Sequence, residues 1–182
     1  MNGDPGPDLR DLTRDEISAM LRDMGEPAFR AGQVYEWIWK HQAVSIAAMT
    51  SLPEPLRKRL SEKFTLNKAT EVQRRISIDG THKVLFRLHD QLLAEAVKIP
   101  AGERNTACVS SQVGCALGCR FCATGRLGFT RNLSTGEMID QVTGVIPSTS
   151  STFELPSNIV FMGMGEPFLN YKALTRAIER IT

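Results

Sequence analysis

The sequence lacks the two features that would direct a protein to or through a membrane. No apolar run approaches the roughly 18 residues that a transmembrane helix needs. The first eight residues have neither the basic start nor the apolar centre of a signal peptide. Cysteine is also scarce, with four residues in the chain, and three of these are clustered. This usage favours a reducing, cytoplasmic environment in which thiols serve chemistry rather than structural bridges.

Length and composition indicate a globular chain. Its 182 residues suffice for one ordinary domain and a small one, and apolar residues make up 42% of them. The net charge of +2 decides nothing, but its distribution is uneven. Residues 1–29 carry 3 basic and 7 acidic groups, whereas residues 30–98 carry 12 basic and 7 acidic groups. A basic middle suits a nucleic-acid contact surface, and an ordinary solvated surface is the alternative.

Three cysteines fall within eight residues, at Cys115, Cys119 and Cys122, with a C-x₃-C-x₂-C spacing. Thiolates this close in sequence can converge on one metal centre, and they are the preferred ligands of iron–sulfur clusters. Three ligands to a 4Fe–4S cluster leave one iron open, which permits catalysis. Zinc is the first alternative, although the second C-x₂-C pair typical of zinc loops is absent. A disulfide is the second alternative, but it would have to close a very tight loop.

The region before these cysteines begins with helical patterns. Thr13 and Glu16 form a capping box, which predicts the start of a helix. A second helix is expected over residues 30–42, where aromatic residues on a broad apolar surface favour a core role over base stacking. Pro53 opens a third, short helix. Residues 12–66 are therefore predicted to form a small helical domain.

Residues 71–99 change to a period of two, which predicts three strands, the first two joined by a turn at Asp79-Gly80. In the third strand, Glu95 shares one face with the apolar residues Leu93, Val97 and Ile99. Apolar surroundings disfavour the charged form of a carboxylate, so Glu95 is a candidate general base. A shift of the register by one residue would instead place it in solvent.

The pattern then alternates between strands and helices. Residues 107–111 predict a strand that leads into the cysteine loop, as expected where metal ligands follow a strand of an α/β barrel. A capping box at residue 134 starts a helix, and residues 159–162 are an apolar run typical of a buried parallel strand. In the loop 163–167, glycines permit the close approach of a ligand and Glu166 could accept from an ammonium group. A simple turn is the better interpretation of that loop taken alone.

The cysteine spacing resembles the signature of radical S-adenosylmethionine enzymes. The longer run from Cys108 to Gly125, CVSSQVGCALGCRFCATG, resembles more specifically the RlmN-type methyltransferases. These enzymes methylate an adenine of large-subunit ribosomal RNA and, in some members, of transfer RNA. The segment FRAGQVYEWI, residues 29–38, and the loop 163–167 match as well, so the resemblance covers about residues 12–182.

The resemblance implies two cofactors and the residues that hold them. In the family, the cysteines that match Cys115, Cys119 and Cys122 hold a 4Fe–4S cluster. The open iron of that cluster binds the amino and carboxylate groups of S-adenosylmethionine, whose sulfonium is cleaved to give a 5′-deoxyadenosyl radical. Gly165 and Glu166 match residues that bind S-adenosylmethionine.

Two more residues match catalytic positions of the family. Glu95 matches its proton acceptor, in agreement with the candidate base identified above. Cys108 matches the cysteine that resolves the RNA adduct by disulfide exchange with a second catalytic cysteine, which carries the methyl group. No cysteine follows Cys122, so the methyl carrier is absent. The isolated chain is therefore expected to complete no turnover.

The fold class implied is α/β, with a small helical domain and a β-hairpin followed by the start of a radical S-adenosylmethionine partial (β/α)₆ barrel. The βα pattern runs for about two units where the family's barrel has six, which favours the N-terminal part of a longer protein. The expected organisation is a flexible tail (1–11), a helical RNA-binding domain (12–66), a β-hairpin and strand linker (67–100) and the first part of the barrel (101–182).

The partners implied are 23S ribosomal RNA, transfer RNA and an electron donor such as flavodoxin, acting on a cytoplasmic monomer. Methylation of adenine C2 is the leading hypothesis. Methylation of C8 by a close relative, a non-catalytic iron–sulfur RNA-binding module and a zinc protein are the alternatives. The cations expected to contact RNA phosphates are Arg57, Lys58, Arg59, Arg74, Arg75 and Lys83.

Overall fold

The structure, a computed structural model, describes residues 6–102, 104–146 and 156–181. It divides into two compact units, the first ending at Asn67 and the second beginning at Lys68. The segment predicted as a strand linker, 67–100, lies almost wholly in the same unit as the cysteine loop. The loop predicted between residues 147 and 157 lies mostly outside the described residues.

The first unit contains the helices α1 (Arg14–Asp23), α2 (Phe29–Trp39) and α3 (Glu54–Lys63), with short 3₁₀ turns at Leu9–Asp11 and Ile46–Ala48. The capping box is confirmed, because Glu16 N donates to Thr13 Oγ1 at 3.1 Å and Thr13 N donates to Glu16 Oε2 at 2.6 Å. Apolar side chains from all three helices bury one core, which includes Ile17, Leu21, Val34, Ile38, Leu56 and Leu60.

Helix α2 ends at Trp39, earlier than the predicted end at residue 42. The chain turns there through Gln42, which has a φ of 47°. The aromatic residues Tyr35, Trp37 and Trp39 pack partly buried against the core of the first unit. Their position agrees with a core role rather than with base stacking.

Residues 8–11, which the sequence placed in the tail, are folded. Leu9 is fully buried, and the Arg10 guanidinium donates to the Asp8 carboxylate at 2.7 Å with both side chains about 95% buried. Leu9 N also donates to Thr65 O at 2.9 Å, which attaches this turn to the end of α3. A Gly- and Pro-rich composition does not reveal such an ion pair, because its partners become buried only in the tertiary fold.

The second unit is built on a five-stranded sheet with the order β1-β2-β3-β4-β7. All neighbours are antiparallel except β4 and β7, which are parallel. A second sheet of two strands, β5 and β6, continues from the end of β4. The strands are β1 (Thr70–Ile76), β2 (His82–Arg87), β3 (Leu93–Ala101), β4 (Arg104–Cys108), β5 (Gln112–Gly114), β6 (Phe129–Asn132) and β7 (Asn158–Val160). The helices are α4 (Ala123–Arg126), α5 (Thr135–Gly144) and α6 (Tyr171–Ile181), with a 3₁₀ turn at Pro167–Asn170.

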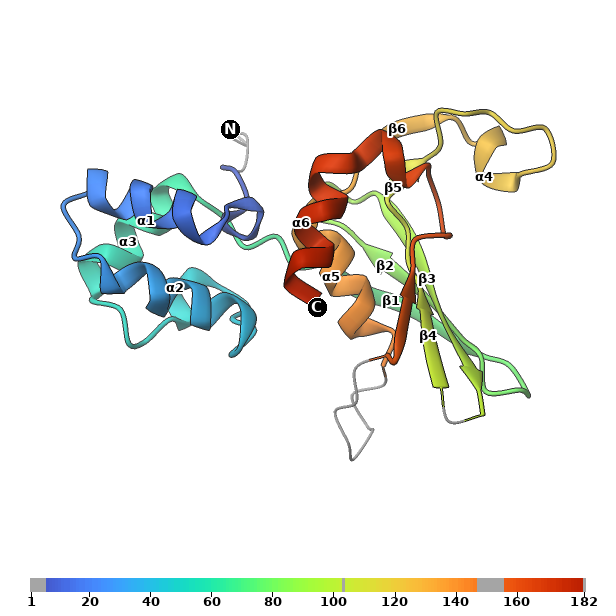
Figure 1. The fold of residues 1–182 in the computed structure, drawn as a ribbon, viewed down its shortest axis with the longest axis horizontal. Helices are drawn as coiled ribbons and strands as arrows, with labels where there is room; N and C mark the ends of the chain where they lie inside the picture. Colours follow the sequence, from blue (N-terminus) through green and yellow to red (C-terminus); the bar gives the residue numbers. More distant parts are fainter. Residues whose placement is uncertain (1–5, 103, 147–155, 182) are drawn as a thin grey trace. The chain divides into compact units, whose positions relative to one another are not determined.

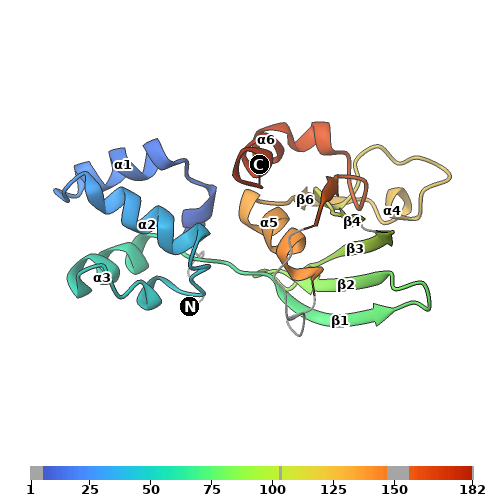
Figure 2. The same cartoon turned by 60° about the horizontal axis from the view of Figure 1, so that its bottom comes forward.

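Helices α5 and α6 cover one face of the five-stranded sheet (Figures 1 and 2). The side chains that point to them are small or apolar and buried, namely Val84, Phe86, Ala94, Ala96 and Ala107. The alternate residues of the same strands point to the other face, which no described helix covers in either view. We call this second side of the sheet the open face.

A buried carboxylate attaches strand β6 to helix α5. Glu137, whose side chain is 1% exposed, receives two hydrogen bonds of 2.8 Å from the Arg131 guanidinium. It also accepts from Ser134 N at 2.9 Å, which confirms the second predicted capping box. The hydrogen bond to the Glu137 carboxylate raises the pKa of the Arg131 guanidinium, so this group stays charged. Arg131 binds Asp90 as well, at 2.6 Å, which connects β6 to the turn before β3.

Replacing Arg131 with Ala should destabilise the second unit strongly. The change leaves the buried Glu137 carboxylate without its cation, and uncompensated buried charges of this kind cost about 3 kcal/mol or more. Urea unfolding followed by far-UV circular dichroism measures the loss. Both tryptophans, Trp37 and Trp39, lie in the first unit, so their fluorescence transition should stay in place. A Lys172→Ala control on the exposed surface of α6 should change neither transition, and an equal effect of the two variants would contradict the prediction.

Candidate functional site

The cysteine loop connects β5 to α4. Its start is held by a hydrogen bond of 2.9 Å from Cys115 N to Gly128 O, and its end by one of 3.1 Å from Cys122 N to Cys119 O. Gly114 has a φ of 76°, and a Cβ at this position would collide with the Gly128 carbonyl. The backbone at residue 114 therefore requires glycine, and it directs the chain from β5 into the loop.

The three loop thiols are free and partly buried. Among the described residues, no three His, Cys, Asp or Glu side chains are already gathered closely enough to hold a metal ion. The donors nevertheless fit an iron–sulfur cluster in kind and in number, since Cys115, Cys119 and Cys122 are free thiols of one short loop whose start is bound to Gly128 O.

The environments of Cys122 and Cys108 differ. A hydrogen bond from the backbone N–H of Gly125 lowers the pKa of Cys122, assisted by Thr124 at the start of α4 and opposed by slight burial. Burial raises the pKa of the Cys108 thiol, partly offset by a hydrogen bond from the backbone of Met162. The thiolate fraction is therefore higher at Cys122 than at Cys108.

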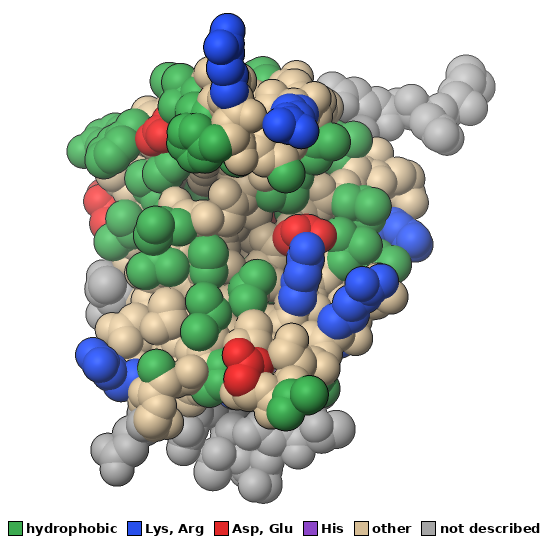
Figure 3. All heavy atoms as spheres, turned by 90° about the vertical axis from the view of Figure 1, so that its right-hand side faces the viewer, with side chains coloured by type: hydrophobic (Ala, Val, Ile, Leu, Met, Phe, Trp, Pro, Cys, Tyr) green, Lys and Arg blue, Asp and Glu red, His purple; other side chains and the backbone are tan. Residues whose placement is uncertain are grey.

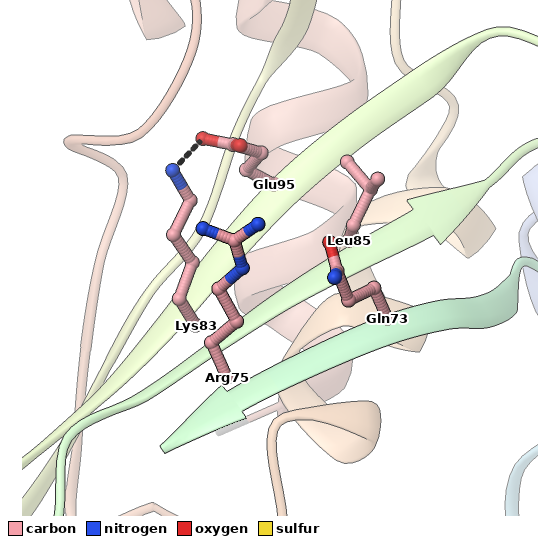
Figure 4. A pocket seen from close by; sticks show the side chains of 5 residues that line it. All are labelled: Gln73, Arg75, Lys83, Leu85 and Glu95. Carbon is pink, nitrogen blue, oxygen red and sulfur yellow. Dashed lines mark ion pairs between the residues drawn. The ribbon is translucent and has the colours of Figure 1, made fainter. Parts of the chain in front are cut away.

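Glu95 and Cys108 lie on the open face. In the register of the sheet, Glu95 is opposite Leu85 and Cys108 is opposite Val97. Apolar residues lie beside Glu95 as expected, among them Leu85 and Leu93, but a cation shares the same face. Its side chain is 41% exposed, and its Oε2 binds Lys83 Nζ at 2.8 Å (Figure 4). Period-two patterns assign the face of a residue but do not show which cations on the neighbouring strands share it.

A hollow of about 580 Å³ lies between Glu95 and the cysteine loop, within the size range of small-molecule sites. The open face, which Figure 3 shows in space-filling form, is hollowed, with hydrophobic side chains gathered around the depression. Gly114 and Ala123, the residues that flank Cys115 and Cys122, line it on one side. The remaining lining includes Leu85, Leu93, Glu95, Leu127 and Met164. The fold thus brings the candidate base and the candidate metal loop, twenty residues apart, to one cavity.

The loop 163–167 packs against the segment that precedes the cysteine loop. A Cβ at Gly163 would lie 2.7 Å from Ser110 Oγ, and one at Gly165 would lie 2.5 Å from Gln112 Cβ. Gly165 also has a φ of 98°, outside the range that other residues adopt readily. These glycines therefore permit the close approach of two backbone segments, in addition to any approach of a ligand.

Glu166 has a local role in the structure. Its N–H donates to Gln112 Oε1 at 3.0 Å, and its Oε1 accepts from Phe168 N at 3.1 Å, so the carboxylate caps the following 3₁₀ turn. One carboxylate oxygen is engaged in this cap. Of the residues in this loop, Met164 rather than Glu166 lines the hollow.

Sequence reasoning missed Ser110 and Gln141, which hold the site together. Ser110 N donates to Gln141 Oε1 at 2.8 Å, and Gln141 Nε2 donates back to Ser110 O at 3.2 Å. Ser110 Oγ donates to Glu95 O at 2.6 Å and accepts from Met164 N at 2.9 Å. Both residues are fully buried. The only sequence signal was a glutamine inside the apolar stripe of a helix, where a polar residue needs partners.

Comparison with known proteins agrees with this site. Residues 7–66 match the family described as ribosomal RNA large subunit methyltransferase N-terminal domain. A probable dual-specificity RNA methyltransferase RlmN from Cytophaga hutchinsonii is 46% identical over 96% of this chain and 48% of its own length. The chain belongs to the RlmN family. A dual-specificity RNA methyltransferase RlmN from Solidesulfovibrio magneticus is 46% identical over 95% of this chain and 50% of its own length.

A solved structure supports the same assignment. The crystal structure of a radical SAM methyltransferase from Sphaerobacter thermophilus matches with a TM-score of 0.81 and 43% identity. The match covers 96% of this chain and 52% of that one. The predicted α/β fold class and the predicted RlmN-type family are thereby confirmed. The chain spans about half the length of the curated RlmN relatives it matches. No described helix is long and apolar enough to span a bilayer.

In the metal-free protein, Cys122 should be alkylated faster than Cys108 near neutral pH. The lowered pKa of Cys122 increases its thiolate fraction, and the raised pKa of Cys108 decreases that of the buried thiol. Timed iodoacetamide labelling followed by peptide mass spectrometry measures both rates in one sample. The ratio of the rates should shrink above about pH 9, where an ordinary thiol ionises as well. Equal rates at pH 7 would contradict the assigned environments.

Replacing Gly165 with Ala should destabilise the second unit by about 2 kcal/mol or more. The added Cβ meets the Gln112 side chain and also requires an unfavourable backbone conformation. Gly102→Ala is the matched control, because Gly102 has a φ of 62° but nothing within 4 Å of the added Cβ. Its cost should be about 1 kcal/mol, from the backbone alone. If urea unfolding shows the same loss for both variants, the close approach of loop 163–167 contributes nothing.

Proposed function

We propose that this chain forms the cluster-binding half of a radical S-adenosylmethionine methyltransferase that methylates C2 of an adenine in 23S ribosomal RNA. Transfer RNA is its second substrate, in keeping with the dual specificity named for its relatives. The observation that supports the proposal is the shared hollow, which is lined both by Glu95 and by the residues that flank Cys115 and Cys122. An adenine that is modified at this site must first be turned out of its base stack. The hollow on the open face offers space for such an adenine.

Cys115, Cys119 and Cys122 would hold a 4Fe–4S cluster as thiolates. When bound, the cluster supplies the electron for reductive cleavage of S-adenosylmethionine. The backbone around Gly165 and the Glu166 carboxylate would orient the amino acid part of S-adenosylmethionine. One Glu166 oxygen accepts from Phe168 N, so the other oxygen would bind the ligand.

Glu95 would accept a proton from the modified adenine at the edge of the hollow. Cys108 would release the RNA product by attacking the sulfur of a methyl-carrying cysteine. A disulfide forms between the two cysteines, the bond from that sulfur to the RNA adduct breaks, and its electron pair leaves with the RNA. The raised pKa of Cys108 favours the thiol form until that partner is present. No cysteine follows Cys122, so we propose that the 182-residue chain alone completes no methyl transfer.

The proposal also covers the location, the electron donor and two alternative functions. The protein would act as a cytoplasmic monomer that receives electrons from a donor such as flavodoxin. Methylation at C8 uses the same motifs and differs in the nucleoside product. A non-catalytic iron–sulfur RNA-binding module would bind RNA equally well without Cys115. The observed cavity between the cysteine loop and Glu95 favours an enzyme over such a module, because a structural cluster needs no adjoining cavity.

Anaerobic iron and sulfide analysis of the purified, reconstituted chain tests the proposal first. About four irons and four sulfides per chain are expected, since three thiolates on an open site suit a 4Fe–4S cluster. Cys119→Ala should lose them, whereas Cys108→Ala should retain them. One zinc without sulfide would refute the radical chemistry. Methyl transfer to RNA by the unmodified 182-residue chain would refute the need for a further cysteine.

A further inference from the structure

A second, polar pocket lies on the open face beside the hollow. It encloses about 180 Å³ and is lined by Gln73, Arg75, Lys83, Leu85 and Glu95 (Figure 4). Leu85 and Glu95 line both cavities, so the two adjoin. The hollow beside the cysteine loop is lined mainly by apolar residues, and the polar pocket carries two cations.

The sheet register explains why the two cations converge. Arg75 on β1 is directly opposite Lys83 on β2, and Gln73 is directly opposite Leu85 in the next row. Neighbouring strands are about 4.8 Å apart, so the long side chains of Arg75 and Lys83 can reach one common anion. Figure 4 shows both cationic groups on the same side of the strands as the Glu95 carboxylate.

Most other cations expected to contact RNA are engaged elsewhere. Arg74 points to the covered face, where it donates to Val145 O at 2.9 Å and Gly144 O at 2.6 Å at the end of α5. In the first unit, Arg57 binds Ala47 O at 2.6 Å and Arg59 binds Met24 O at 2.7 Å. The Arg75 side chain makes no hydrogen bond or ion pair with any described residue. Among the cations expected to contact RNA, Arg75 and Lys83 are the two that line this pocket.

The ion pair between Lys83 and Glu95 is exchangeable. Its side chains are 51% and 41% exposed, and exposed pairs of this kind contribute little to stability. A phosphate brought close to Arg75 and Lys83 would offer charge-assisted hydrogen bonds from two donors at once. Competition for the Lys83 ammonium would then favour the phosphate over a single carboxylate.

We infer that Arg75 and Lys83 hold a backbone phosphate of the RNA strand beside the nucleotide that enters the hollow, and that Lys83 leaves Glu95 for this phosphate. The inference rests on the proposed RNA substrate. Phosphate contacts set the register of a strand without reading its sequence, which suits a protein with two RNA substrates. The exchange releases the Glu95 carboxylate from its cation when RNA is in place, so strand binding and the proposed proton acceptance are coupled.

Fluorescence anisotropy with a labelled RNA hairpin, whose loop contains an unpaired adenine, tests the inference on the metal-free 182-residue chain. Arg75→Gln and Lys83→Gln should each reduce the slope of log affinity against log salt by about 0.7, the value for one contact to a single strand. At 0.1 M salt, the affinity should fall about fivefold for each variant. Lys172→Gln, which removes the same charge from α6, should leave slope and affinity unchanged.

A double-mutant cycle tests the exchange of partners. Glu95→Gln should raise RNA affinity severalfold when Lys83 is present, because the ammonium no longer has a competing carboxylate. In the Lys83→Gln background, the same replacement should have no effect. An equal gain in both backgrounds would mean general repulsion between Glu95 and RNA, and would overturn the exchange. Circular dichroism confirms that each variant is folded as the unmodified chain is.

Other outcomes are also decisive. If Arg75→Gln and Lys83→Gln bind RNA as the unmodified chain does, or lose no more than Lys172→Gln, the phosphate site is refuted. Absence of salt-dependent RNA binding by the unmodified chain refutes it too. Binding requires no iron, so a chain that fails to assemble a cluster would count against the proposed chemistry and not against this site. Conversely, the cluster could assemble while Arg75→Gln and Lys83→Gln bind RNA as the unmodified chain does. That result would count only against the phosphate site.

Discussion

The site depends on a reciprocal pair of buried hydrogen bonds between Ser110 and Gln141. This pair attaches the segment after β4 to helix α5. The Ser110 hydroxyl also donates to the Glu95 carbonyl and accepts from Met164 N, which attaches β3 and the loop 163–167 to the same point. A buried hydroxyl or amide without partners would cost more than a hydrogen bond gains, so these groups tolerate one arrangement only. Since the cysteine loop begins a few residues later, its position relative to Glu95 follows from this network.

The two faces of the sheet in the second unit have different roles. On the covered face, small and apolar side chains such as Ala96 and Phe86 pack against α5 and provide stability. On the open face, Lys83 and Glu95 remain accessible because no described helix covers them. Alternation along each strand assigns neighbouring residues to opposite tasks, which explains how Arg74 supports α5 while Arg75 faces the site.

Much of the fold was predictable because its signals are local. The capping boxes at Thr13 and Ser134 involve residues three positions apart, and both form as predicted. The predicted hairpin also forms, and β7 is parallel to β4, although β7 is shorter than the apolar run at 159–162. The missed features are contacts between distant residues. The Arg131–Asp90 pair and the turn that buries Leu9 join segments about 40 and 55 residues apart, and no local pattern encodes such a pairing.

The sequence by itself determined the spacing of the thiols, the family and the order of the elements. The type and spacing of possible ligands are properties of a short segment, so Cys115, Cys119 and Cys122 could be identified without knowledge of the fold. Only the tertiary structure decided what surrounds Glu95. The strand pattern placed this residue on one face, but the neighbours on that face come from other strands and include Lys83 and Arg75. Cross-strand register, which depends on turns, bulges and the burial of the opposite face, brings these charges together, and it arises only when the whole sheet has formed.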